Sequence, residues 1–141
     1  MINRRMAENT LEDARTILQE AKAAYEAERF HRSVRLSQES FELSMKACLR
    51  AVGIEYPKEH EISDTFAEHE NMFPEWFEEE VGKIRVASVW LTEKRGIAMY
   101  GDEIRGVALS KLFTGIDGET AIKYASEAAT LAERLLKQLF G

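Results

Sequence analysis

Apolar residues recur at steps of three and four along four stretches of the chain, which is the period of one face of an α-helix. The repeat predicts a first helix over about 10–28 and a second over 30–52, and the second is apolar on two sides, as expected of a central helix. A third long helix is expected over about 74–100, and a final helix, capped by Asp117, runs to the C-terminus. The pattern therefore predicts an all-α protein.

The segments between these stretches contain residues that end or begin helices. Gly53 suits a left-handed cap at the end of the second helix, and Pro57 prevents its continuation. Ser63 or Asp64 can open a short helix that reaches about residue 70, whereas 101–116 is a glycine-containing connection with room for one helical turn. We therefore predict an up-down four-helix bundle of two antiparallel helical hairpins, with a short additional helix on the connection between them.

The length and composition fit one soluble domain over residues 1–141, with 45% apolar residues and no linker. One cysteine, Cys48, and three histidines are too few for a zinc site, and the chain has no glycine-rich phosphate loop, so neither metal nor cofactor is expected. The N-terminus has no secretory signal and no run reaches 18 apolar residues, which predicts a cytoplasmic protein outside the membrane.

The formal net charge is -6, so the whole molecule does not attract a phosphate backbone. Contact with nucleic acid would depend on a local basic patch. Arg29, His31, Arg32 and Arg35 form such a cluster where the first two helices meet. The cluster is either a solvated helix end or a patch that contacts phosphate.

Polar residues at steps of four mark one face of the predicted central helix. Gln38, Glu42 and Lys46 form this ladder within SQESFELSMKA, and a Pro-Lys-x-His loop follows at 57–60. The pattern resembles the signature of the HEPN family, prokaryotic helical domains associated with nucleotides and RNA, and the order of helices around it fits that family. Taken without the family, Glu42 and Lys46 are a solvated ion pair and His60 is a loop histidine.

A second feature of that family is an arginine near the end of the third long helix, followed four to six residues later by a histidine that acts on RNA in the RNA-cleaving members. Arg95 matches, but Tyr100, Gly101 and Asp102 occupy the positions for the histidine. A phenol, with an ordinary pKa of about 10, cannot replace imidazole as a base near neutral pH. Tyr100 can still stack on a base and Arg95 can still hold a phosphate. The departure counts against nuclease activity and leaves nucleotide binding open.

Arg95 also continues the apolar line formed by Ile84, Ser88 and Leu91, which places its charge at the inward or interfacial edge of the bundle. A buried charge is costly unless it is paired, so a carboxylate partner or a bound anion is expected beside Arg95. Arg50, near a helix end, is expected to be solvated and offers a reference for Arg95.

The resemblance implies a HEPN-type nucleotide-binding and interaction module that partners a minimal nucleotidyltransferase in a toxin-antitoxin-like pair. One alternative is a metal-independent endoribonuclease in which other groups assist the arginine, and a second is a purely structural or assembly protein. The candidate residues for nucleotide or anion binding are Arg95, Tyr100, Asp102, Lys46, Glu42 and His60.

A homodimer is also expected, because the helical bundle has two surfaces that one short chain cannot cover. These surfaces are the stripe of alanines on the last helix and the edge that contains Arg95. The interface should include the third long helix.

Overall fold

The computed structural model describes residues 2–58, 61–100 and 108–141, and all regular structure in these ranges is helical. The long helices are α1 (Ile2–Glu26), α2 (Phe30–Ala51), α5 (Val81–Tyr100) and α7 (Gly115–Phe140). The short ones are α3 (Ile62–Glu68), the 3-10 turn η1 (Glu70–Met72), α4 (Glu75–Glu78) and α6 (Leu109–Leu112). The predicted all-α class is confirmed.

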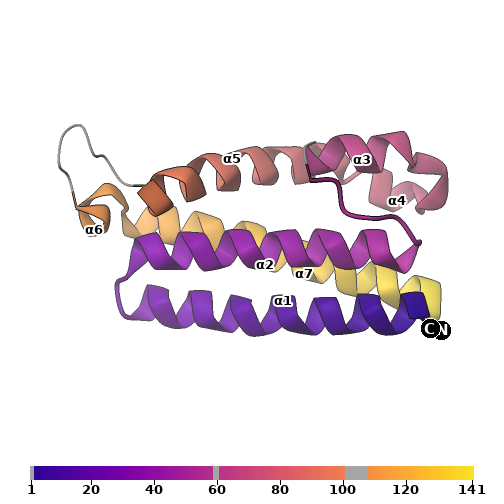
Figure 1. The fold of residues 1–141 in the computed structure, drawn as a ribbon, viewed down its shortest axis with the longest axis horizontal. Coiled ribbons are helices and arrows are strands. Elements are labelled where there is room, and N and C mark those ends of the chain that lie inside the picture. Colours follow the sequence, from indigo (N-terminus) through magenta and orange to yellow (C-terminus); the bar gives the residue numbers. More distant parts are fainter. Residues whose placement is uncertain (1, 59–60, 101–107) are drawn as a thin grey trace.

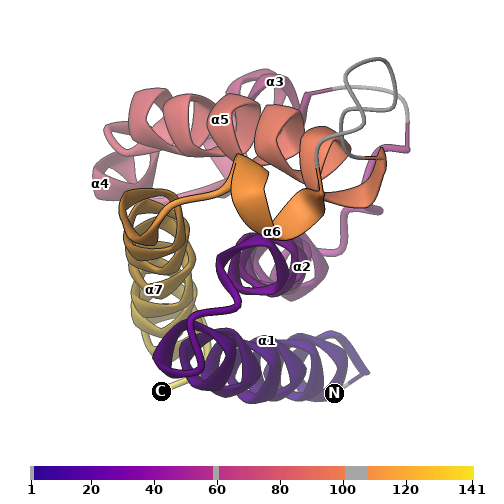
Figure 2. The same cartoon turned by 90° about the vertical axis from the view of Figure 1, so that its left-hand side faces the viewer.

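The long helices form a bundle in which α2 is central (Figure 1). α2 packs most extensively against α1, then against α7 and α5, whereas α5 and α7 contact each other only sparsely. Viewed along the bundle, α1 lies below α2, α7 to its left and α5 above it (Figure 2). The remaining flank of α2 is not covered by any helix of the described chain. The expectation that this helix is central, drawn from its apolar residues on two sides, is confirmed.

Small residues allow α1 and α2 to approach closely, a feature that the apolar pattern of the sequence does not signal. Four serines of α2 are fully buried: Ser33, Ser37, Ser40 and Ser44. The hydroxyl of Ser33 donates a hydrogen bond to the carbonyl of Ala21 at 3.0 Å, and that of Ser40 donates to the carbonyl of Ala14 at 2.7 Å. These bonds satisfy polar groups that would otherwise be costly to bury.

Several predicted boundaries need correction. α1 begins at Ile2 rather than near residue 10, because the buried face continues back to Ala7. Thr114, not Asp117, is the N-cap of α7, and Asp117 is the third helical residue of a reciprocal capping box with it. The predicted end of α2 is confirmed at Ala51, and Gly53 has the left-handed φ of +79°.

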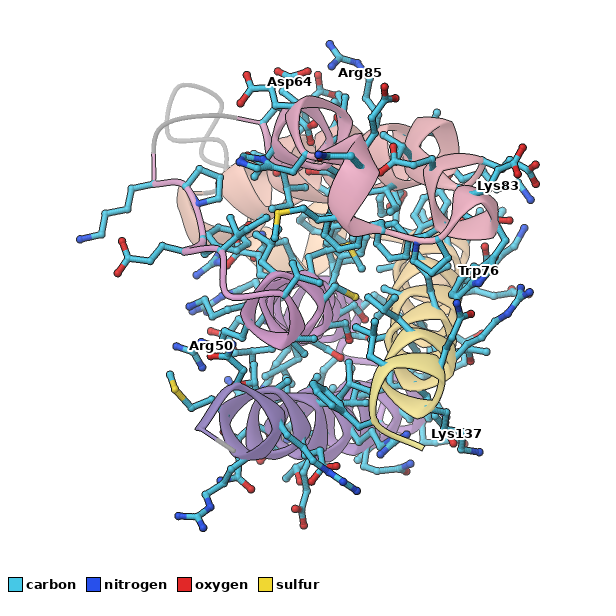
Figure 3. The ribbon with its side chains drawn as sticks, turned by 90° about the vertical axis from the view of Figure 1, so that its right-hand side faces the viewer. Arg50, Asp64, Trp76, Lys83, Arg85 and Lys137 are labelled. Carbon is cyan, nitrogen blue, oxygen red and sulfur yellow. The ribbon has the colours of Figure 1, made fainter. Side chains whose placement is uncertain are left out.

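The helix expected over 74–100 is interrupted between α4 and α5. Phe77 is fully buried, with ring centroids 5.0 Å from Phe66 and 4.7 Å from Phe73, and this aromatic cluster fixes α4 against α3. Trp76 joins α4 to α7, because its indole N–H donates to the side chain of Gln138 at 2.7 Å (Figure 3). Tertiary contacts on both sides of α4 therefore oppose a straight continuous helix.

The alanine stripe of α7 does not form an exposed face. Ala121, Ala125 and Ala132 are fully buried and Ala128 is 5% exposed, because the stripe packs inside the bundle of one chain. The expectation that this stripe contributes to a dimer interface is therefore wrong.

Two further expectations concern single features of the chain. Cys48 is fully buried as expected of a core residue, and burial raises the pKa of its thiol. Within the described residues, no helix combines the length and the apolar character needed to cross a membrane.

Candidate functional site

The ladder on α2 and the loop that follows this helix meet in one groove. The groove has a volume of about 430 Å³ and lies between α2, the loop at 56–58 and α5. Gln38 and Glu42 line it from α2, Tyr56 and Lys58 from the loop, and Glu93 from α5. The structure thus brings together two segments that carry the resemblance, although they are separated along the chain.

Arg95 joins α5 to α2 through a polar cluster beside this groove. Its Nη1 donates a hydrogen bond to Oε1 of Gln38, and Nε2 of Gln38 donates to Oε1 of Glu42 at 2.6 Å. The guanidinium also lies 3.9 Å from carboxylate oxygens of both Glu39 and Glu42. Gln38 is only 3% exposed, and the side chain of Arg95 is 30% exposed.

The expected carboxylate partners of Arg95 are therefore present within the chain itself. Two carboxylates flank one guanidinium, so the cluster carries excess negative charge. A phosphate would have to displace these carboxylates before it could form a fork with Arg95. The cluster by itself favours a structural role, in which Arg95 holds α5 against α2, over the binding of a free anion.

Lys46 does not form the ion pair with Glu42 that the sequence suggested. Among the described residues no Glu42–Lys46 contact lies within 4.0 Å, and the ammonium of Lys46 instead lies 5.3 Å from the centroid of the Tyr56 ring. Burial, and then the carboxylates of Glu42 and Glu61, raise the pKa of Tyr56. The phenol therefore stays protonated and can donate a hydrogen bond.

Arg50, which the sequence marked as a solvated reference, makes a defined contact. Its Nη1 donates to the hydroxyl of Thr10 on α1 at 2.6 Å, and its side chain lies where the C-terminal end of α2 meets the N-terminal part of α1 (Figure 3). Lys46, Arg50 and Lys58 line a second groove of about 420 Å³. No pattern within α2 signals the contact with Thr10, because the two residues are 40 positions apart.

The basic cluster lies at the opposite end of α2. Arg29 is the N-cap residue of this helix, and Arg32 is exposed. At 1.5 Å per residue, Arg32 and Arg50 are about 27 Å apart along the helix axis. Burial, and then the charges of Arg35, Arg32 and Arg29, lower the pKa of His31. The cluster and the two grooves are therefore separate features on the same helix.

Three of the predicted candidates cannot be placed in the site. His60 and Asp102 lie outside the described residues, as does the side chain of Tyr100. Across the part of the chain that the structure describes, no group of three or more histidine, cysteine or acidic side chains is arranged to hold a metal ion.

Comparison with known proteins identifies the family. The model of the HEPN domain matches residues 7–135. The crystal structure of TT1696 from Thermus thermophilus is similar in fold, with a TM-score of 0.72 and 21% sequence identity over 91% of this chain and 96% of that one. A search of curated proteins gave no match. Because the family model spans nearly the whole sequence, the chain belongs to the HEPN family.

Proposed function

We propose that this protein is a non-catalytic HEPN module that forms a homodimer through α5, binds a nucleotide and partners a minimal nucleotidyltransferase in a toxin-antitoxin-like pair. The observation that supports assembly most strongly is that α5 has apolar side chains on two sides. Ile84, Ala87 and Leu91 are buried in the core. A second stripe faces outward.

The outward stripe contains Val86, Val89 and Ile97, which are 60%, 41% and 44% exposed. Their spacings of three and eight residues keep them on one side of the helix. Exposed apolar side chains are unfavourable in water, and a second copy can cover Val86 and Val89, which lie one turn apart, by two-fold pairing of α5 with α5. This arrangement agrees with the expected involvement of the third long helix.

The nucleotide-binding part is supported by the uncovered flank of α2. Residues of both signs, from Arg32 and Arg35 through Glu39 and Glu42 to Lys46, recur at steps of three and four and therefore share one partly exposed face of α2. The flank adjoins the groove of about 430 Å³, in which Tyr56 offers an aromatic surface. Such a mixture of polar and aromatic groups suits a small polar ligand.

Sedimentation velocity of charge-introducing variants tests the interface. Val86→Glu combined with Val89→Glu should convert a dimer to a monomer, because each carboxylate would be buried against its symmetry mate. Leu139→Glu is the matched control, since Leu139 is 38% exposed on α7 rather than α5. If the double variant sediments like wild type, or the control dissociates equally, α5 does not mediate assembly.

The partner can be tested by co-expression with a nucleotidyltransferase encoded beside this gene, followed by affinity purification. We expect the enzyme to co-purify with wild type. Support for this pairing comes from family membership. If a folded, co-expressed nucleotidyltransferase does not bind, the proposed pairing is wrong, whereas the proposed homodimer is not affected by this result.

A further inference from the structure

We infer that the groove lined by Lys46, Arg50 and Lys58 binds the terminal phosphate group of a small ligand. The inference rests on the proposed nucleotide-binding function, and it moves the anion-binding position away from Arg95. We call this feature the basic groove. Its residues are Asn3, Met6, Lys46, Arg50, Gly53, Ile54, Glu55, Tyr56 and Lys58.

Donor groups in the basic groove come from separate parts of the chain. Lys46 and Arg50 lie one turn apart on α2, and Lys58 is supplied by the loop after this helix. Asn3, from α1, places its side-chain nitrogen 3.4 Å from the position that a Cβ on Gly53 would occupy. The groove therefore gathers three cations and an amide donor around about 420 Å³.

The three cations of the basic groove form no ion pairs with carboxylates of the described residues. Lys46 lies over the neutral ring of Tyr56, and Arg50 donates to the neutral hydroxyl of Thr10. In the described ranges, neither these two residues nor Lys58 makes an ion pair within 4.0 Å, whereas Arg95 has two. Glu55 is the one acidic residue among those that line the groove. A local positive site thus exists in a protein with a net charge of -6.

The chemistry of these donors fits phosphate. A guanidinium can donate two parallel hydrogen bonds to phosphate oxygens, and two ammonium groups can neutralise the remaining charge. The adjoining groove, which shares Tyr56 and Lys58, is lined by Glu42, Glu61 and Glu93. These carboxylates would repel a phosphodiester backbone that continued along α5. A small molecule with a terminal phosphate is therefore favoured over an RNA strand.

Titration of ¹⁵N-labelled protein with inorganic pyrophosphate and with adenosine monophosphate tests the site. We expect backbone amide shifts to concentrate near Asn3, Arg50 and 53–58. Lys58→Gln and Arg50→Gln should each weaken binding about tenfold, the effect of one charge-assisted hydrogen bond. Lys58 is exposed in a loop, so its replacement keeps the test valid even if Arg50→Gln disturbs the contact with α1.

Arg85→Gln is the matched control. Arg85 is an exposed arginine of α5 that pairs with Asp64 of α3, away from the basic groove (Figure 3). Equal weakening by Arg85→Gln, absence of binding at millimolar pyrophosphate, or shifts centred on 29–35 would overturn the inference. Tighter binding of single-stranded RNA without a terminal phosphate would overturn the small-ligand assignment. Failure of the inference is distinguishable from failure of the proposed function. A protein that binds adenosine monophosphate without amide shifts near the basic groove contradicts only the basic groove, whereas a protein that binds neither ligand contradicts nucleotide binding as well. The dimer is tested separately by the solution mass.

Discussion

Replacement of Arg95 by alanine removes the polar cluster that joins α5 to α2. The change breaks the hydrogen bond to Gln38 and leaves the side-chain carbonyl of this buried residue without its partner. Loss of a hydrogen bond to a charged group costs about 1.5–3 kcal/mol. The contacts with Glu39 and Glu42 are longer and partly exposed, so each adds under about 1 kcal/mol. We expect the free energy of unfolding to fall by about 2 kcal/mol.

Urea unfolding followed by circular dichroism measures this loss. With a slope of about 2 kcal/mol per molar urea, the midpoint should fall by about 1 M. Arg85→Ala provides the control, because Arg85 and Asp64 are both 58% exposed and their ion pair is worth under about 1 kcal/mol. If Arg95→Ala is no more destabilising than Arg85→Ala, the cluster does not hold α5 on α2 and the structural role assigned to Arg95 is wrong.

Further predictions concern packing, pH and catalysis. Gly118→Ala should destabilise the fold by about 1–3 kcal/mol, because the new Cβ would lie 3.0 Å from the Tyr25 ring. Gly96→Ala should be neutral or stabilising by up to about 1 kcal/mol, since the new Cβ would meet no described atom within 4 Å apart from the backbone of its own helix, and thermal unfolding of both variants measures the difference. Burial and nearby arginines lower the pKa of His31 from its ordinary value of 6.5, so the folded state binds fewer protons than the unfolded state. The free energy of unfolding should therefore decrease as pH falls below 6.5, and an equal decrease in His31→Gln would exclude His31 as the cause. Purified protein should not cleave RNA above background, because two carboxylates hold Arg95; metal-independent cleavage that is lost in Arg95→Ala would favour the ribonuclease alternative.

The apolar period was sufficient to predict the four long helices, because each buries apolar side chains at this period, although the start of α1 was missed. It located α2 at the centre, and Gly53 and Pro57 identified where this helix ends. The interruption between α4 and α5, near residue 80, could not be predicted from the apolar period. Phe77 satisfies the helical period but is held by rings from α3 and the following turn, and such contacts are specified only by the folded structure.

The candidate site likewise combines contacts that the sequence predicted with contacts that only the folded structure specifies. Burial of a permanent charge predicted a partner for Arg95, and two carboxylates are present. Spacing on α2 alone suggested a Glu42–Lys46 pair, but the loop brings Tyr56 to Lys46 and α5 brings Arg95 to Glu42. Local spacing identifies which side chains can meet within one helix, whereas competition from other segments decides which contacts form.

The solution mass of the wild-type protein tests the central claim, that the exposed stripe of α5 makes this HEPN module a homodimer. Multi-angle light scattering at micromolar concentration measures this mass directly, without variants. The expected value is twice the chain mass of 16.1 kDa. A single species at 16.1 kDa would show that no second copy covers the stripe and would contradict the proposed homodimer.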